Sequence, residues 1–454
     1  MSEDFPDAPE RPVEDVGADG RGGRRSMLSA TLFTYGTNAA VSVLSLANVL
    51  IVARVLGAHA RGEVAFVITV STLTAHVAGL SVQEANANLA GSEPSLRPRL
   101  ATNSLVLSLA CGALAAAVVQ LLVSVFPAVG GPVPPSLLWA ALAVIPIVIG
   151  RNYFSFLLQA EYAFGPTNTA WLIGPLSSVT GNAILAIIGR ITVTTAFATW
   201  IGGQILGLAI MLVYVARRSG FGRADVGLAR RTLSFGLRTH PGRLMGIGNY
   251  RADQWLVGSI SGSRALGLYS VAVAWADLLF YVPGVLTLVQ RPDLVRATRE
   301  NAARQAARVF RVALLLSSVA ALGLIVLAPF LCTVVFGHEF AGSTNQLRVL
   351  ALGCLGITAI DLLPNALTAQ RMPIRGTGGI AVAFVVMLAL DVVLIPPFAG
   401  LGAAAATAIA YTAGGIVALM IFVRALHCDA RELVPRVAEV RWLWRKMQTL
   451  RSRA

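Results

Sequence analysis

Long runs of hydrophobic residues, separated by short polar stretches, follow one another along almost the whole chain. An α-helix needs about 20 apolar residues to cross a bilayer. The runs lack the short alternation of a transmembrane β-barrel, so we interpret them as helices. The sequence therefore predicts an all-α polytopic membrane protein with about twelve transmembrane helices, at residues 28–53, 63–89, 101–126, 136–158, 166–189, 191–216, 234–260, 265–289, 309–336, 346–370, 376–396 and 400–424.

The predicted helices divide into two halves of six, and the halves contain a weak internal echo. Gly57 and Gly62 follow the first run, and Gly262 and Gly267 follow the seventh with the same spacing. Because six crossings is an even number, both halves enter the membrane in the same orientation. This predicts two six-helix bundles related by a parallel pseudo-twofold repeat. A second echo relates four later polar positions, Asn182 and Thr199 to Asp391 and Thr407.

The distribution of charge sets the expected topology. The formal net charge is +14, but the arginines gather in alternate loops, which excludes nucleic acid and places both termini in the cytoplasm by the positive-inside rule. We expect a multi-pass protein of the plasma membrane whose basic tail binds anionic lipids. Its expected segments are a disordered cytoplasmic tail (1–27), an N-terminal bundle (28–218), a basic cytoplasmic linker (219–232), a C-terminal bundle (233–426) and a basic amphipathic cytoplasmic tail (427–454).

The sequence carries no recognisable catalytic or cofactor motif. It contains no P-loop, no HExxH pair and no Gly-x-Ser-x-Gly elbow. The four cysteines have no paired spacing, which predicts neither disulfides nor a metal site. We therefore expect a protein that is not an enzyme and needs no cofactor.

Polar residues recur along one face of the first predicted helix. They are spaced by three or four residues, as one helical face requires, and comprise Thr31, Thr34, Tyr35, Asn38, Ser42, Ser45 and Asn48. Such a face is costly against lipid, so it should line a cavity or bind a neighbouring helix. We favour a cavity for the stripe as a whole.

Charged residues inside the predicted helices are the candidate site. The seventh helix carries Arg243, Arg251 and Asp253, the eighth Asp277 and the tenth Asp361. A charge this far from the membrane surface costs on the order of 3 kcal/mol. An ion pair of Arg251 with Asp277 or Asp361 and direct contact with substrate explain it equally well. Since guanidinium matches phosphate bidentately, the substrate should be anionic. Arg151, nearer the cytoplasmic end, should extend to the interface.

Four stretches resemble the Wzx-type polysaccharide flippases of the multidrug/oligosaccharidyl-lipid/polysaccharide exporter superfamily. They are Ala53-Arg54-Val55-Leu56-Gly57 through Arg61-Gly62-Glu63, Arg251-Ala252-Asp253-Gln254 through Gly267-Leu268-Tyr269-Ser270-Val271-Ala272, Val335-Phe336-Gly337-His338-Glu339-Phe340, and Gly400-Leu401-Gly402-Ala403-Ala404-Ala405-Ala406-Thr407. The resemblance implies two bundles around a cationic cavity and alternating-access translocation of a polyprenyl-diphosphate-linked oligosaccharide to the outer leaflet. It also implies that Arg54, Arg251 and Asp253 are site residues.

Other functions remain open at this stage. A cation-coupled multidrug exporter of the same fold usually carries an acidic residue in an early helix, and none is found in the first helix here. A lipid II flippase usually has fourteen spans. A membrane enzyme acting on lipid-linked sugars would normally have a large loop domain, and a scaffold for glycan assembly would tolerate substitution of Arg251. A flippase would share its pathway with a glycan polymerase or glycosyltransferases, which are candidate partners.

Overall fold

The computed structural model describes residues 20–435 except 282, 285, 288–289, 291–293 and 295–296, and for residues 20–32 and 35 only the backbone. All regular structure in these residues is helical, which confirms the predicted fold class. Parts of both predicted tails lie outside the described residues, namely 1–19 of the N-terminal tail and 436–454 of the amphipathic tail.

The first half contains α1 (Gly20–Ala78), α2 (Val82–Ser92), α3 (Arg97–Val125), α4 (Pro135–Ala143), α5 (Ile145–Ala160), α6 (Phe164–Ile187) and α7 (Val193–Arg218). The second contains α8 (Val226–Ala276), α10 (Arg299–Pro329), α11 (Ser343–Ala369), α12 (Pro373–Gly376) and α13 (Gly378–Leu426). Short helical turns are η1 (Pro94–Leu96), η2 (Pro127–Gly130), η3 (Asp277–Phe280), η4 (Phe330–Val335, a π-helix), η5 (His338–Phe340) and η6 (Ala430–Leu433).

Nine helical segments of the described chain are long and apolar enough to cross a membrane. Three of them, Gly36–Ala78, Val226–Phe280 and Pro373–Leu426, have 43, 55 and 54 residues, far more than one crossing needs. Each contains one residue with non-helical dihedral angles, at Gly57, Gly262 or Ala399. These breaks fall between predicted spans. The total of twelve and the two-bundle layout remain predictions.

The echo between the halves is visible in the backbone. Gly57 has φ 77° and ψ 178°, and Gly262 has φ 84° and ψ 178°, a conformation that glycine alone adopts without strain. The two following helical segments then touch backbone to backbone. A Cβ on Gly62 would lie 1.7 Å from the carbonyl oxygen of Ser263, and one on Gly267 would lie 1.8 Å from that of Ala58. We call this end, which the topology predicts to be extracellular, the outer end.

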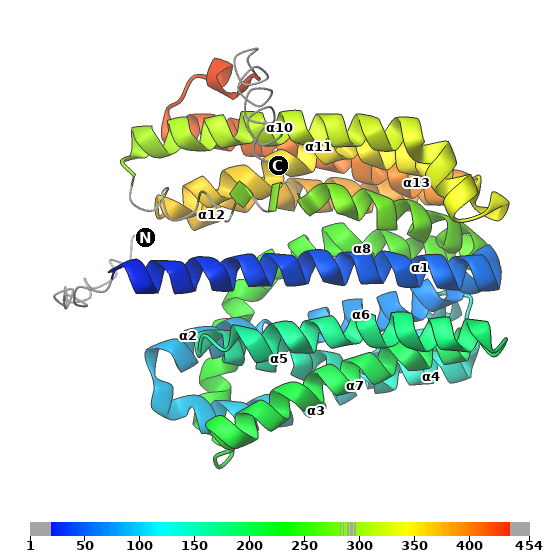
Figure 1. Ribbon diagram of the computed structural model, residues 1–454, viewed down its shortest axis with the longest axis horizontal. Coiled ribbons are helices and arrows are strands. Elements are labelled where there is room, and N and C mark those ends of the chain that lie inside the picture. Colours follow the sequence, from blue (N-terminus) through cyan, green and yellow to red (C-terminus); the bar gives the residue numbers. More distant parts are fainter. Residues whose placement is uncertain are drawn as a thin grey trace.

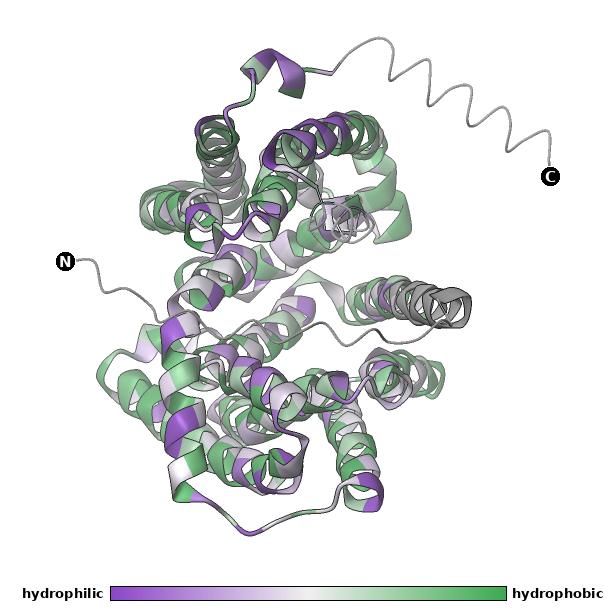
Figure 2. Cartoon of the chain, turned by 90° about the vertical axis from the view of Figure 1, so that its left-hand side faces the viewer, coloured by the Kyte–Doolittle hydropathy of each residue, from purple (hydrophilic) through white to green (hydrophobic). Residues whose placement is uncertain are grey.

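Figure 1 shows the helices running roughly along one axis, with α10, α11 and α13 on one side, α3, α5 and α7 on the other, and α1 and α8 between them. Hydrophobic residues make up much of the peripheral helices (Figure 2). Many of their apolar side chains are exposed, among them Leu109, Leu121, Val319, Leu322, Val385 and Val392. These surfaces suit contact with lipid. Between the halves, Phe66, Tyr153 and Tyr269 are fully buried in one core cluster.

The predicted span 63–89 is not one helix. α1 ends at Ala78 and α2 begins at Val82, because Leu80 and Ser81 have φ values of 45° and 51°. The carbonyl of Gly79 accepts hydrogen bonds from the backbone N–H of Val82 at 3.1 Å and from the Tyr153 hydroxyl at 2.8 Å. The Ser81 hydroxyl lies 3.0 Å from Nδ1 of His240 in α8. The break therefore gives the second half a polar contact with the first at the end opposite Gly57.

Candidate functional site

A cavity of about 770 Å³ lies between the halves. Helix α1 contributes much of the predicted polar stripe to its wall, namely Asn38, Ser42, Ser45 and Asn48, followed by Arg61, Thr69 and Thr72. The other charged or amide-bearing residues of the wall are Arg151, Gln204, Arg251, Gln254 and Asp277. The stripe hypothesis is confirmed to this extent. Three guanidinium groups face one carboxylate, so the described wall has a formal charge of +2 (3 − 1).

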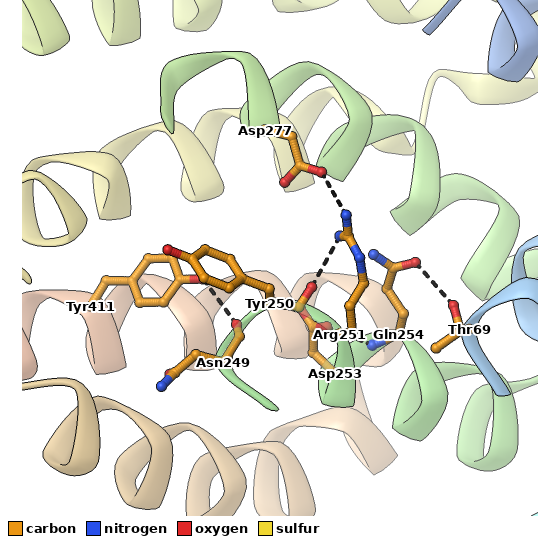
Figure 3. Close-up of polar contacts among 8 residues, drawn as sticks. All are labelled: Thr69, Asn249, Tyr250, Arg251, Asp253, Gln254, Asp277 and Tyr411. Atoms are coloured by element: carbon orange, nitrogen blue, oxygen red, sulfur yellow. Dashed lines mark hydrogen bonds and ion pairs between the residues drawn. The ribbon is translucent and has the colours of Figure 1, made fainter. Parts of the chain in front are cut away.

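Arg251 pairs with Asp277, one of the two partners that the sequence offered. Its Nη2 lies 3.2 Å from Oδ2 of Asp277, and its Nη1 donates to the carbonyl of Tyr250 at 3.0 Å (Figure 3). The neighbouring Gln254 accepts a hydrogen bond from Thr69 of α1 at 3.4 Å. The Arg251 and Asp277 side chains are 40% and 33% exposed, so both can reach a ligand in the cavity.

Arg61 differs from Arg251 because its guanidinium has no partner among the residues that the structure describes. The residue is only 8% exposed and borders the cavity. It makes no hydrogen bond or ion pair with any residue that the structure describes, and its Nε is fully buried. A buried charge without a partner is strongly unfavourable. Arg61 is therefore a candidate ligand for an anion in the cavity. The sequence placed it in an outer turn and did not select it.

The expectation that Arg151 extends to the interface is wrong. Its side chain is 3% exposed and points into the first half. Nη1 donates to Oε1 of Gln204, Nη2 donates to the carbonyl of Ala170 at 2.8 Å, and the guanidinium carbon lies 4.4 Å from the Trp171 ring centroid. These helices cover most of the guanidinium, which also borders the cavity, so the charge stays inside the protein.

The remaining predicted site residues lie outside the cavity wall. Arg54 donates to the carbonyl of Val335 at 2.7 Å and to that of Val334. Arg243 pairs with Glu84 of α2 at 3.1 Å. Asp361 accepts a hydrogen bond from the Tyr250 hydroxyl at 3.3 Å. The structure thus brings together Asn38, Arg251 and Asp277 and places the others at contacts between helices.

Asp253 belongs to a separate acidic cluster behind the cavity. It accepts hydrogen bonds from the backbone of Gln254 at 2.7 Å, from the Tyr269 hydroxyl, and from Thr407 at 3.5 Å. Asp391 of α13 is 0% exposed, and neither of its carboxylate oxygens has a hydrogen-bond partner within residues 20–435 as far as the structure describes them. It lies close enough to Asp253 for their charges to interact. Two buried carboxylates whose charges repel each other are stabilised by a proton or a cation.

The corresponding cluster of the first half is neutral. Adding the 205-residue offset between Gly57 and Gly262 to Asn48 gives position 253. Asn48 accepts a hydrogen bond from Asn182 at 2.7 Å, and Asn182 accepts one from Thr199 at 3.0 Å. The second sequence echo therefore marks two equivalent polar clusters, of which only the one in the second half is acidic.

Three solved structures with similar folds help to define the class of protein. The lipid II flippase MurJ in an inward closed conformation superposes with a TM-score of 0.73, 15% identity and 89% of each chain covered. An inward-facing multidrug resistance MATE family transporter of the MOP superfamily superposes with a TM-score of 0.69 and 14% identity. The superposition covers 85% of this chain and 94% of that one. A MOP superfamily transporter from Pyrococcus furiosus, described as having reverse polarity of the binding pocket, superposes with a TM-score of 0.57 and 14% identity. Here 88% of this chain and 96% of that one are covered.

These superpositions establish that the chain has the fold of the MOP superfamily transporters, a class of multi-pass helical membrane proteins. No curated protein matches the sequence. The family model described as "Polysaccharide biosynthesis protein" matches residues 51–345. Because this is well over half of the 454 residues, the chain belongs to that family, as the sequence resemblance predicts.

Proposed function

We propose that the protein is an alternating-access flippase that moves a polyprenyl-diphosphate-linked oligosaccharide from the cytoplasmic to the outer leaflet. The observation that carries this proposal is Arg61, a guanidinium buried in the cavity wall without a partner in the described part of the chain. A diphosphate supplies the anionic oxygens that such a group binds best. Arg251 is the second phosphate ligand, with Asp277 holding it in position.

The polar cavity suits a headgroup rather than a whole lipid. Its wall mixes guanidinium, carboxylate, amide and hydroxyl groups with aromatic rings and aliphatic side chains. Sugar hydroxyls and phosphates would satisfy these groups, whereas a polyprenyl chain would gain nothing from them. The chain would instead remain in the bilayer beside the apolar outer surfaces of the helices (Figure 2).

The acidic cluster provides a site for coupling to an ion. Neither carboxylate oxygen of Asp391 has a partner among the described residues, so a proton or a small monovalent cation shared with Asp253 would remove an unfavourable buried charge. Loading and unloading this site would change the packing of α8 against α13, in which the two aspartates lie.

The same cluster also favours the second candidate function, a cation-coupled exporter of small molecules. The two readings differ in the cargo that the basic cavity accepts, because cationic drugs would be repelled by its formal charge of +2 (3 − 1). A lipid II flippase is a third reading, since lipid II is also a polyprenyl diphosphate. It differs only in the glycan that is carried.

The test is depletion of the protein in its native cell, with lipid-linked glycans quantified by mass spectrometry and assigned to a leaflet. A flippase predicts accumulation of one diphosphate-linked oligosaccharide in the inner leaflet and loss of its surface polymer. Accumulation of lipid II would identify a lipid II flippase. Unchanged pools of lipid-linked glycans would favour small-molecule export. Complementation with Arg61→Gln, compared with the exposed Arg190→Gln, tests the residue that carries the proposal.

This function places the protein in the plasma membrane with both termini in the cytoplasm. Its partners would be anionic membrane lipids and the polymerase and glycosyltransferases that make and use the lipid-linked glycan. Their association is testable by crosslinking in native membranes.

A further inference from the structure

We infer that Arg151 and Trp171 form a subsite for a second anionic group of the substrate, carried by the glycan and separate from the diphosphate. The substrate class would then be a lipid-linked oligosaccharide with an acidic sugar, such as a uronate. This inference rests on the proposed flippase function and specifies its cargo. It is carried by the surroundings of Arg151, by its distance from Arg61 and by the aromatic wall beside it.

Two glycines, in α6 and α7, leave the space that the Arg151 guanidinium occupies. A Cβ on Gly207 would lie 2.9 Å from its Nε, and a Cβ on Gly174 would lie 3.4 Å from its Nη1. Both positions must stay small for the side chain to fit. Arg151 is thus held from α5 between α6 and α7, in a space that these two glycines leave for it.

The partners of Arg151 leave its charge uncompensated. Gln204, Ala170 and Trp171 offer only neutral oxygens and a π-system, and no ion pair among the described residues includes Arg151. A merely structural crosslink would be less costly with a neutral side chain, because burying a guanidinium without a counter-ion is unfavourable. A charge retained beside the cavity is explained if the substrate brings the counter-ion.

The height of this subsite in the membrane follows from the register of α6 against α1. Asn168 donates to Thr34 at 3.0 Å and Asn182 donates to Asn48 at 2.7 Å, both across 134 residues. The equal offsets show that α6 runs parallel to the first part of α1. Trp171 therefore lies beside Thr37, near the start of the polar stripe.

Arg61 lies much nearer the outer end. It follows the Gly57 break by four residues, and Val52 and Val64 on either side of the break pack in one cluster, so Arg61 lies level with about residue 55. From there to Thr37 is some 18 helical residues, or about 27 Å at 1.5 Å per residue. Allowing for the reach of the side chains, the two guanidiniums are separated by roughly 20 Å. One diphosphate cannot bind both.

Aromatic rings beside Arg151 suit a sugar. Trp171 and Trp200 both border the cavity. Trp200 is stacked on Phe197, with ring centroids 5.6 Å apart and planes at 13°, which fixes its orientation. Flat indole faces beside amide and guanidinium donors match the apolar faces and polar rims of pyranose rings. The subsite therefore provides both a stacking surface and a charge for an acidic sugar.

The experiment uses the full-length protein in lipid nanodiscs and two probes. The first is a tetrasaccharide of alternating glucuronate and N-acetylglucosamine, with its neutral methyl ester for comparison. The second is a short-chain isoprenyl diphosphate linked to one neutral sugar. Binding is followed by saturation-transfer NMR and calorimetry for wild type, Arg151→Gln, Arg151→Lys, Trp171→Phe, Arg61→Gln and the control Arg190→Gln.

We expect the acidic tetrasaccharide to bind wild type about tenfold more tightly than its ester. This ratio should fall to about one in Arg151→Gln, remain partly in Arg151→Lys, and persist in Arg61→Gln and Arg190→Gln. Because the ratio compares two probes on the same variant, partial unfolding does not change it. Arg61→Gln should lose binding to the diphosphate probe, whereas Arg151→Gln should keep it.

Three outcomes would overturn the inference. The first is equal binding of acid and ester to wild type, and the second is an unchanged preference in Arg151→Gln. The third is that Arg151→Gln loses binding of the diphosphate probe and no longer distinguishes the acidic tetrasaccharide from its ester. Arg151 would then be a second binding residue for the diphosphate. Failure of the diphosphate probe to bind wild type would instead contradict the proposed function itself.

Discussion

The carboxylate of Glu339 accepts a hydrogen bond from the backbone N–H of Ala58 at 3.0 Å and so joins η5 to α1 across 281 residues of chain. A Cβ on Gly57 would lie 2.8 Å from the same carboxylate, which leaves room for glycine only. One turn earlier, Arg54 donates to the carbonyl of Val335 at 2.7 Å. These contacts close the outer end between the halves, and an outward-open state must break them.

Replacing Glu339 by Ala should favour opening at the outer end. The variant loses one interhelical hydrogen bond of about 1 kcal/mol, which shifts an open–closed equilibrium by about fivefold. The measurement is the rate at which a membrane-impermeant maleimide labels a cysteine placed at Ser45, in a protein whose native cysteines are replaced. Glu339→Gln keeps an acceptor oxygen and should label at close to the wild-type rate. Equal rates for Ala and Gln would contradict the role of this contact.

The close backbone approach at Gly62 gives a stronger effect on the same closure. A methyl group there would overlap the carbonyl oxygen of Ser263, so Gly62→Ala must separate the two helices. We expect a loss of about 1–3 kcal/mol in the stability of the closed form, seen as a lower melting temperature and faster labelling at Ser45. Gly165→Ala, with no atom within 4 Å of the new Cβ, is the control and should be neutral or slightly stabilising. A melting temperature equal to that of the control would refute this packing.

Arg251 and Asp277 allow a test that separates substrate contact from structural pairing. Arg251→Ala leaves Asp277 without its partner and should lower glycan export at least tenfold, as loss of a charge-assisted contact predicts. Arg251→Lys should rescue only part, because an ammonium lacks the planar fork. If the pair is only structural, Arg251→Ala combined with Asp277→Ala will recover export. We expect no recovery at matched protein levels, measured as surface polymer.

Asp391→Asn tests the acidic cluster. Because neither carboxylate oxygen has a partner in the described chain, the neutral amide should fold at least as stably as wild type, within about 1 kcal/mol. Transport in proteoliposomes should lose its response to an imposed pH or sodium gradient. Asn182→Ala, in the equivalent neutral cluster of the first half, should keep that response even if its rate is lower. A full gradient response in Asp391→Asn would exclude the cluster as the coupling site.

Hydrophobic run length and helical periodicity were enough to predict the fold class, the glycine echo and the polar face of α1. They offered Asp277 as one of two possible partners for Arg251, and only the structure decides between them. These features depend on spacing within one or two helices, which the sequence records directly. The break after Ala78 could not be predicted, because Leu80 and Ser81 are ordinary helix residues held in a left-handed conformation by contacts with α5 and α8.

Arg61 and Arg151 were missed for a different reason. Both lie near the ends of predicted helices, where a long side chain can usually reach water. Whether it does so depends on which neighbour covers that face, and for Arg151 this is decided by Gly174 and Gly207 on two other helices. Asp391 was noticed only as part of a repeat. The surroundings of these three residues depend on which residues of neighbouring helices lie against them, and residue type alone does not predict this.

The unpaired guanidiniums have a consequence for the energetics of the transport cycle. A cargo with two or three negative charges leaves the loaded cavity close to neutral, whereas the empty cavity keeps a formal charge of +2 (3 − 1). A membrane potential acts on moving charge with about 2.3 kcal/mol per elementary charge for each 100 mV. A potential that is negative inside would therefore act mainly on the unloaded carrier, drawing its cavity back toward the cytoplasm for the next cargo.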